Sequence, residues 1–214
     1  MAIFSLLSGC SAPEKNLKSI TFDNSYFYTD GKFNEDKAKD AVIALMEYHN
    51  YPVYDGIREQ LWVSDYGTGE FTKLGLAAIC PINNEKDLYM LQDLFLLPGQ
   101  MLPEHWHEKP DNLPVKMEAW FLRNGSSYVA GEGVDNLSSF PEVVIPSCHL
   151  NGKVNARHVE LSTPGKTLKL NKEGERHWQF AGKEGAIMSE VANVHSNIKV
   201  RHSDKGINDH FLGK

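Results

Sequence analysis

Two histidines one residue apart, His105 and His107, are the first feature of this chain that could do chemistry. A lysine and a glutamate with the same spacing, Lys116 and Glu118, follow a proline-rich stretch. Side chains alternate between the two faces of a β-strand, so on strands the members of each pair would point the same way. If the two segments pair as a hairpin, two imidazoles and one carboxylate converge, with an ammonium beside them. The alternative is a pair of surface histidines on an edge strand.

A third histidine, His177, stands where a turn leads into an apolar segment, and such a position can aim a side chain into the mouth of a barrel. Imidazole and carboxylate ligands together suit divalent Mn, Fe, Ni, Co or Zn. With His105, His107 and Glu118, this residue completes a set of three histidines and one carboxylate. Such a set leaves metal positions open for water or substrate, as a catalytic centre requires. Taken alone, His177 would be interpreted as a structural residue.

Glu190 lies in the apolar segment 186–191 and is the candidate for proton transfer. On the inward face of a strand it would be a buried carboxylate with a shifted pKa, which suits a general base. On the outward face it would be an ordinary solvated residue. Lys116 has a similar alternative, because a solvated lysine on a strand is the commoner state for that residue type.

The elements that must position these residues are mostly strands, after one helix. Asn34 can cap a helix whose apolar residues recur on one face, and this helix should end near Asn50 because Pro52 follows. Short segments separated by turn signals such as Asn124–Gly125 and Gly182 follow, and this pattern favours a β-sandwich or barrel. The predicted strands are 61–63, 74–82, 88–97, 116–122, 127–130, 143–145, 167–170, 178–181 and 186–191.

Two regions have no clear pattern. Residues 134–160 are predicted to form an irregular loop, and the tail after Asn193 cannot be placed. The histidines outside the proposed cluster lack ligand spacing and are assigned to the surface or to loops. They are His49, His149, His158, His195, His202 and His210.

Composition narrows the class of protein. The 214 residues are 41% hydrophobic and 23% charged, which is ordinary for a globular protein. A net charge of −6 without a basic block argues against nucleic-acid binding, and no apolar run is long enough to cross a membrane. Residues 7–11 around Cys10 are similar to a lipoprotein signal, so residues 1–16 are either such a leader or a disordered arm. We expect a cytoplasmic protein, with a lipid anchor on Cys10 as the alternative.

The arrangement HxH…E…H, with Pro-Gly before each half, resembles that of cupins. More specifically, the chain resembles the cupin-type D-lyxose ketol-isomerases over residues 36–194. Its departures are the linker between His107 and Lys116, Asn124–Ser126 in place of a glycine run, and residues 134–160, which look inserted. The resembling segments are 63–70, 74–76, 98–107, 115–118 and 176–190.

The resemblance implies a mainly β fold. Residues 17–214 would form one cupin domain, a double-stranded β-helix or jelly-roll barrel, with an N-terminal helical segment. It also implies a homodimer and a divalent metal, usually Mn(II), with Co, Ni, Fe or Zn as alternatives. The implied metal ligands are His105, His107, Glu118 and His177.

The implied reaction converts D-lyxose to D-xylulose, and also D-mannose to D-fructose, through a cis-enediolate. Lys116 and Glu190 match the pair assigned to proton transfer, and Trp106 and Trp178, beside proposed ligands, are candidates to contact the sugar ring. One alternative is an Fe(II)-dependent cupin dioxygenase, which leaves Lys116 and Glu190 unexplained. The other is a non-catalytic sugar-binding cupin, which would not need that pair.

Overall fold

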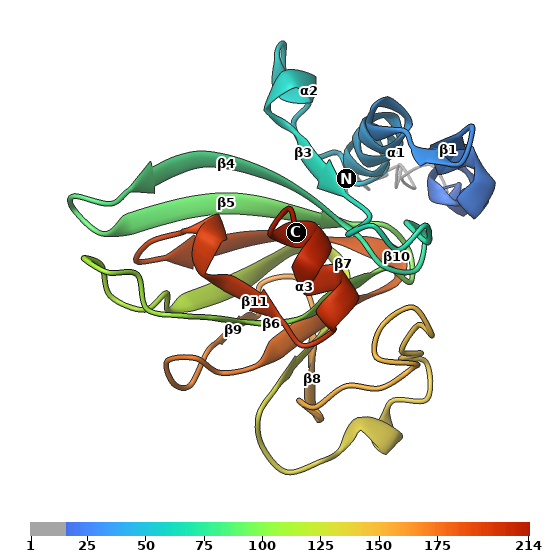
Figure 1. Cartoon of the computed structure of the whole chain (residues 1–214). Helices are drawn as coiled ribbons and strands as arrows, with labels where there is room; N and C mark the ends of the chain where they lie inside the picture. Colours follow the sequence, from blue (N-terminus) through green and yellow to red (C-terminus); the bar gives the residue numbers. More distant parts are fainter. Residues whose placement is uncertain (1–15) are drawn as a thin grey trace, which may run out of the picture.

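The computed structural model describes residues 16–214, and these form a mainly β structure, as the sequence predicts (Figure 1). Its main sheet has the strand order β11-β6-β10-β5-β4-β3 and curls into a half-barrel, and β7 pairs with β10, β8 and β9. The pairings between these strands are antiparallel. The strands are β3 (Trp62–Ser64), β4 (Leu76–Asn84), β5 (Tyr89–Leu96), β6 (Met101–His107), β7 (Glu118–Gly131), β8 (His158–Ser162), β9 (Thr167–Lys169), β10 (His177–Ala192) and β11 (Val200–His202).

The two longest strands, β7 and β10, run side by side and bend together. The prediction of turns at Asn124–Gly125 and at Gly182 is therefore wrong, because both lie inside these strands. At the bend the register shifts, and Gly125 adopts a φ of +72°. A Cβ on Gly125 would lie 2.0 Å from the carbonyl oxygen of Gly185, so only glycine allows this contact. The bend lets the first half of β10 pair with β6 and the second half with β5.

The N-terminal helix α1 (Glu35–Tyr48) forms where the sequence predicts it. The side chain of Asn34 caps it by accepting a hydrogen bond from the backbone N–H of Lys37 at 3.1 Å. Its apolar face packs on the outer face of the sheet, where Leu45 belongs to the same buried cluster as Phe95 and Ile187. The smaller elements of the N-terminal part are η1 (Leu17–Ile20), η2 (Asn24–Phe27), β1 (Tyr28–Thr29), β2 (Lys32–Phe33) and α2 (Ile57–Gln60).

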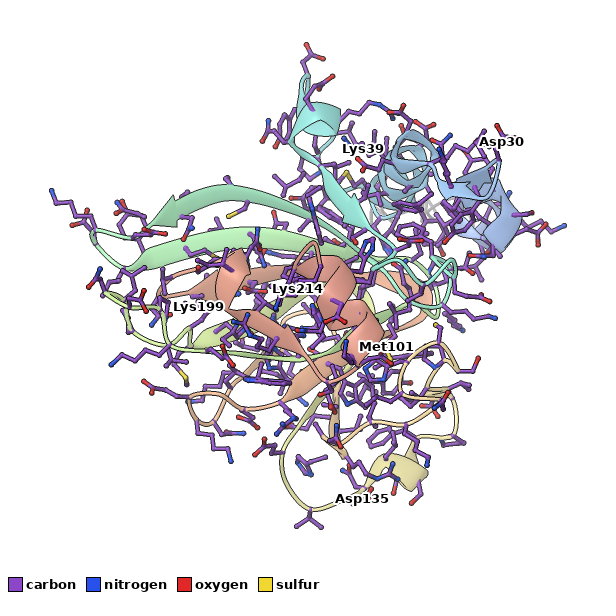
Figure 2. All side chains as sticks on the ribbon, viewed as in Figure 1. Asp30, Lys39, Met101, Asp135, Lys199 and Lys214 are labelled. Atoms are coloured by element: carbon purple, nitrogen blue, oxygen red, sulfur yellow. The ribbon has the colours of Figure 1, made fainter. Side chains whose placement is uncertain are left out.

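The connection between β7 and β8, called here the excursion (residues 132–157), covers another part of the outer face. It contains one short helix, η3 (Leu137–Ser139), so the prediction of a strand at residues 143–145 is wrong. Figure 2 shows Asp135 in the excursion, at the opposite end of the molecule from Lys39 on α1. The apolar side chains of the excursion pack against Trp178 and Phe180 of β10.

The tail after β10 returns to the barrel through η4 (Asn197–Lys199), β11 and α3 (Lys205–Phe211), drawn in red in Figure 1. Strand β11 pairs with β6, and Ile207 of α3 joins the buried interior cluster. No helix in the described part of the chain has the length and apolarity that crossing a membrane requires. The leader predicted in residues 1–16 lies, apart from Asn16, outside the described residues, so the location of the protein stays a prediction.

Candidate metal centre and its cavity

The four predicted ligands converge inside the barrel. One nitrogen or oxygen from each of His105, His107, Glu118 and His177 lies within 4.8 Å of the others, and all four residues are buried. The hairpin proposed from the sequence does not form, because β6 pairs with β10 and β11 within the described residues. Instead, His105 stands directly opposite His177 across the β6–β10 pairing. The two histidines of β6 share a face, as the period of two predicts.

Hydrogen bonds fix the orientation of two imidazoles. His105 Nδ1 lies 2.9 Å from the carbonyl oxygen of Pro103, and His177 Nδ1 lies 2.9 Å from that of Glu175. A carbonyl oxygen only accepts, so each Nδ1 carries the proton and each Nε2 presents a lone pair. Glu118 Oε1 lies 2.9 Å from His107 Nε2 and 2.8 Å from His177 Nε2. Within the described residues, His177 Nε2 is buried without a hydrogen-bond partner.

The charge states suit metal binding. Burial lowers the pKa of His105 well below its usual range and that of His107 to about 4, so both imidazoles are neutral near pH 7. Burial alone would raise the pKa of Glu118, but Lys116 and His107 outweigh it and hold that pKa well below its usual range. Neutral imidazoles, a carboxylate and an unsatisfied buried nitrogen form a donor set that fits a divalent metal ion.

A buried ion pair adjoins the cluster. The ammonium of Lys116 lies 2.5 Å from Glu190 Oε1 and 2.6 Å from Glu118 Oε2, so it joins a proposed ligand to the proposed base. Burial and the charge of Glu118 raise the pKa of Glu190 to about 7. Burial opposes the charge on Lys116, but Glu118 and Glu190 outweigh it and raise its pKa. The Nε1–H group of Trp120 donates to Glu190 Oε2 at 3.3 Å.

A cavity of about 310 Å³ opens beside these groups, which is the size of a small-molecule site. His105, His107, Lys116 and Glu190 line it, so two of the proposed ligands and the ion pair face the same space. The structure thus brings together all six residues that the sequence analysis assigned to metal binding and proton transfer. Trp62 of β3 forms another part of the wall.

The tail supplies cavity residues that the sequence analysis missed. His195 and His202 were assigned to the surface or to loops, yet both line the cavity. Asn193 anchors the tail to the loop that carries Lys116, because its side chain accepts from Met117 N at 2.9 Å and donates to Val115 O at 3.0 Å. The alternation of Val200 and His202 around a polar residue was the available signal, and it is too short to identify a strand.

His195 Nδ1 lies 3.2 Å from the Lys116 ammonium, and its Nε2 lies 2.7 Å from Asn197 Oδ1. Since Lys116 can only donate, His195 accepts at Nδ1 and carries its proton on Nε2. Burial and the charge of Lys116 lower the pKa of His195 to about 4. His49 and His149 are also buried rather than on the surface, but neither lines this cavity.

The structure does not place Trp106 and Trp178 at the cavity. Each follows a proposed ligand in a strand, so its side chain points to the opposite, outer face. The guanidinium carbon of Arg176 lies over the indole ring of Trp106, 4.6 Å from the centre of that ring. Trp178 is fully buried beneath the excursion and donates to the carbonyl oxygen of Ala156 at 2.8 Å. A ligand in the cavity would not reach either ring.

No protein-family model matches the chain, but curated relatives do. It is 30% identical over 157 residues to a D-lyxose/D-mannose isomerase of Thermosediminibacter oceani. The matched segment covers 72% of this chain and 82% of the relative. It is also 30% identical over 158 residues to a D-lyxose ketol-isomerase of Cohnella laeviribosi, with 74% and 84% covered. The chain belongs to the D-lyxose ketol-isomerase family. The family resemblance stated from the sequence is thereby confirmed.

Solved structures support the fold of this family member. The L-ribose isomerase of Cellulomonas parahominis superposes with a TM-score of 0.60 at 12% identity, covering 81% of this chain and 92% of that one. The L-ribose isomerase of Acinetobacter sp. DL28, in complex with L-ribose, gives 0.58 at 12% identity, with 83% and 94% covered. At this identity the likeness concerns the fold alone, and it confirms the mainly β, cupin-type barrel predicted for the chain.

Proposed function

We propose that this protein interconverts an aldose and a ketose, with D-lyxose and D-xylulose as its main pair and D-mannose and D-fructose as a second pair. The observation that carries the proposal is the buried ion pair of Lys116 and Glu190, 2.5 Å apart, which touches the proposed ligand Glu118 at one wall of the cavity. The names of the family relatives, D-lyxose ketol-isomerase and D-lyxose/D-mannose isomerase, support the choice of sugars.

The reaction needs one carbon-bound hydrogen to move from C2 to C1 of the open-chain sugar. A divalent cation held by the four ligands would polarise the carbonyl group and make the C2 hydrogen acidic. Glu190 takes that hydrogen as a proton, and the electron pair of the broken bond forms the C1–C2 double bond of a cis-enediolate. Glu190 then returns the proton to C1. The hydroxyl proton of O2 passes to O1, and Lys116 donates to these oxygens as their charge changes.

The surroundings of Glu190 suit both halves of this transfer. A pKa of about 7 lets the carboxylate accept a proton and give it back near neutral pH. Lys116 and Trp120 hold its two oxygens, so it is oriented before the sugar arrives. A dioxygenase would have no use for a base and an acid at this position, and a sugar-binding protein would not need them. The ion pair therefore favours an isomerase over both alternatives.

We propose Mn(II) as the native metal. A cluster of three imidazoles and a carboxylate, without a thiolate, accepts Mn(II) but also binds Co, Ni or Zn. Because Mn(II) is the weakest binder in that series, its use depends on supply in the cell. Metal analysis of protein purified from its native host tests this assignment, and stoichiometric zinc or iron in active protein would contradict it.

We also propose a homodimer. The outer face of the sheet beyond α1 carries an uncovered apolar row, in which Ile82 and Val191 flank Leu91 in register. Ile82 is 40% and Val191 51% exposed, and Tyr89 on the same face is 51% exposed. Such a patch favours association with a second copy. Sedimentation should show a dimer that Val191→Lys weakens, and a monomer at micromolar concentration would contradict the proposal.

The isomerase proposal is tested with metal-loaded protein and a panel of pentoses and hexoses. We expect ketose formation from D-lyxose, a slower reaction of D-mannose, and deuterium at C1 of the product formed in heavy water. Removal of the metal should abolish the reaction, and adding back Mn(II) should restore it. Stoichiometric metal without ketose formation from any aldose of the panel would reject the proposal.

A further inference from the structure

His202 is a buried histidine at the cavity for which the described residues provide no hydrogen-bond partner. It lies on β11 directly opposite His105, with the two ring centres 5.6 Å apart. Its side chain is among the groups lining the cavity, and the residue is only 5% exposed. Within residues 16–214, neither of its ring nitrogens has a hydrogen-bond partner. Buried polar atoms are rarely left in this state, so a partner that enters from the cavity is expected.

The ring of His202 is held in place by its surroundings. Tyr66 and Phe211 contact it edge to face, with ring centres 5.2 and 5.0 Å away. The backbone N–H of His202 donates to Asn208 Oδ1 at 3.1 Å, which fixes the strand at this residue. The imidazole is therefore oriented in advance, and a ligand that binds it does not have to order it.

The chemistry of the ring selects the kind of ligand. A neutral imidazole presents one N–H donor and one acceptor nitrogen. A hydroxyl group is also both a donor and an acceptor. A carboxylate or phosphate would leave the acceptor nitrogen without a partner, and an apolar ligand would leave both nitrogens without one. A polyol is the ligand class that matches this wall of the cavity.

The position of the strand indicates which part of a sugar would meet this residue. In the sheet, β6 separates β11 from β10, which carries Glu190. C1 and C2 of the sugar must lie against Glu190 and Lys116 for the proposed reaction. We propose that His202 binds a hydroxyl group at C3 or beyond, and so selects the sugar. This inference rests on the proposed function, because the position of C1 and C2 is taken from it.

The first test separates binding from catalysis. His202→Phe keeps a flat ring between Tyr66 and Phe211 but removes both polar atoms. We expect KM for D-lyxose to rise about 10-fold or more, as for the loss of one well-formed hydrogen bond. The value of kcat should stay within about 3-fold, and the metal content should not change. His202→Asn, which keeps one donor and one acceptor, should recover part of the loss. His210→Phe, the same exchange at an exposed position of α3, should behave as wild type.

The second test distinguishes sugar binding from a structural role, with the unreactive polyol D-arabinitol as the probe. A structural histidine would lower Tm when replaced. Replacing an unsatisfied buried histidine with Phe should instead leave the sugar-free Tm unchanged or raise it. The increase in Tm that D-arabinitol produces in metal-loaded wild type should shrink in His202→Phe. The same comparison with His202→Asn serves if the Phe variant does not fold.

An unchanged KM in His202→Phe, together with an unchanged response to D-arabinitol, would overturn the inference while wild-type turnover of D-lyxose upheld the proposed function. A lower sugar-free Tm with normal polyol binding would also overturn it, in favour of a structural role. If wild type converts no aldose in the panel, the proposed function fails. The D-arabinitol experiment then still decides whether His202 binds a polyol.

Discussion

His105 and His177 face each other across the paired strands β6 and β10, with their ring centres 4.1 Å apart. Each imidazole meets the carbonyl oxygen of the residue two positions earlier, Pro103 or Glu175, at 2.9 Å. The same hydrogen bond from Nδ1 to the backbone thus occurs in both strands, and it orients both Nε2 lone pairs toward the interior of the barrel. The cluster is organised by the backbone of the sheet before any metal arrives, and this raises affinity because little has to be ordered on binding.

Replacing His105 or His177 by Ala should therefore weaken binding of Mn(II) by about 100-fold or more, since the loss of supporting groups alone typically costs 10–100-fold. The measurement is metal content after dialysis, together with the increase in Tm that added Mn(II) produces. His158→Ala is a suitable control, because His158 contacts the carbonyl oxygen of Val134 and lies outside the cluster. Full metal content in the double variant of His105 and His177 would show that the metal binds elsewhere.

Glu190→Gln should keep the metal and lose turnover by about 10²–10⁴-fold, because the amide has nearly the same shape but cannot accept the C2 proton. Lys116→Met should also impair turnover. Because this change removes the charge that keeps the pKa of Glu118 low, it can weaken metal binding as well. The kinetics should be measured on variants whose metal content matches that of wild type. A metal-loaded Glu190→Gln enzyme with near wild-type turnover would remove Glu190 from the mechanism.

Much of this site was predictable because it depends on local periodicity. The shared face of His105 and His107 follows from the alternation of a strand, and the cap at Asn34 follows from side-chain chemistry. The same alternation argues against Trp106 and Trp178 as cavity residues, since each adjoins a ligand and must point outward. His177 was suggested by its place before an apolar segment and Glu190 by its place inside one, and the family resemblance then joined both in one site.

Other features depend on contacts between distant residues and could not be predicted. Gly125 has the positive φ of a turn residue, but here it allows a bend within a long strand, and local sequence does not distinguish the two. The pairing of β6 with β10 instead of β7 is a property of the whole barrel. His195 and His202 reach the cavity only because the tail returns and pairs with β6, and a strand of three residues leaves almost no pattern.

Acid should destabilise the metal-free protein. A histidine whose folded pKa lies below its unfolded value of about 6.5 binds fewer protons when folded, so its contribution to stability is lost as pH falls below 6.5. Glu190 has the opposite sign between pH 4.5 and 7, because its folded pKa is raised to about 7. The histidines with lowered pKa values are His105, His107, His195 and His202.

Unfolding near pH 5.5 should thus take up about three protons net, and the free energy of unfolding should fall between pH 6.5 and 5. The measurement is Tm and urea unfolding of protein stripped of metal, at several pH values. His202→Phe should reduce the proton uptake by about one. A free energy of unfolding that is constant or increases on acidification over this range would contradict the assignment of these buried histidines as neutral.

Glu104, the residue before His105, points to the outer face and is fully buried. Its carboxylate accepts from the backbone N–H groups of Asn155 and Ala156 at 2.8 and 2.7 Å, and from the hydroxyl group of Ser203. One side chain thus joins the end of the excursion, and the segment between β11 and α3, to β6. It holds both segments against the strand that carries two proposed ligands.

Glu104→Ala would leave the backbone N–H group of the buried Ala156 without a partner, at a cost of about 1–3 kcal/mol, and would also remove the bonds from the exposed Asn155 and from Ser203. We expect a loss of about 3 kcal/mol in the free energy of unfolding, measured with urea, and faster hydrogen exchange at Asn155 and Ala156. Glu104→Gln keeps one acceptor oxygen and should lose less. Because Ser203 follows His202, the Ala variant should also raise KM for D-lyxose. An Ala variant as stable as wild type, with unchanged exchange at Asn155, would show that the carboxylate does not hold these segments.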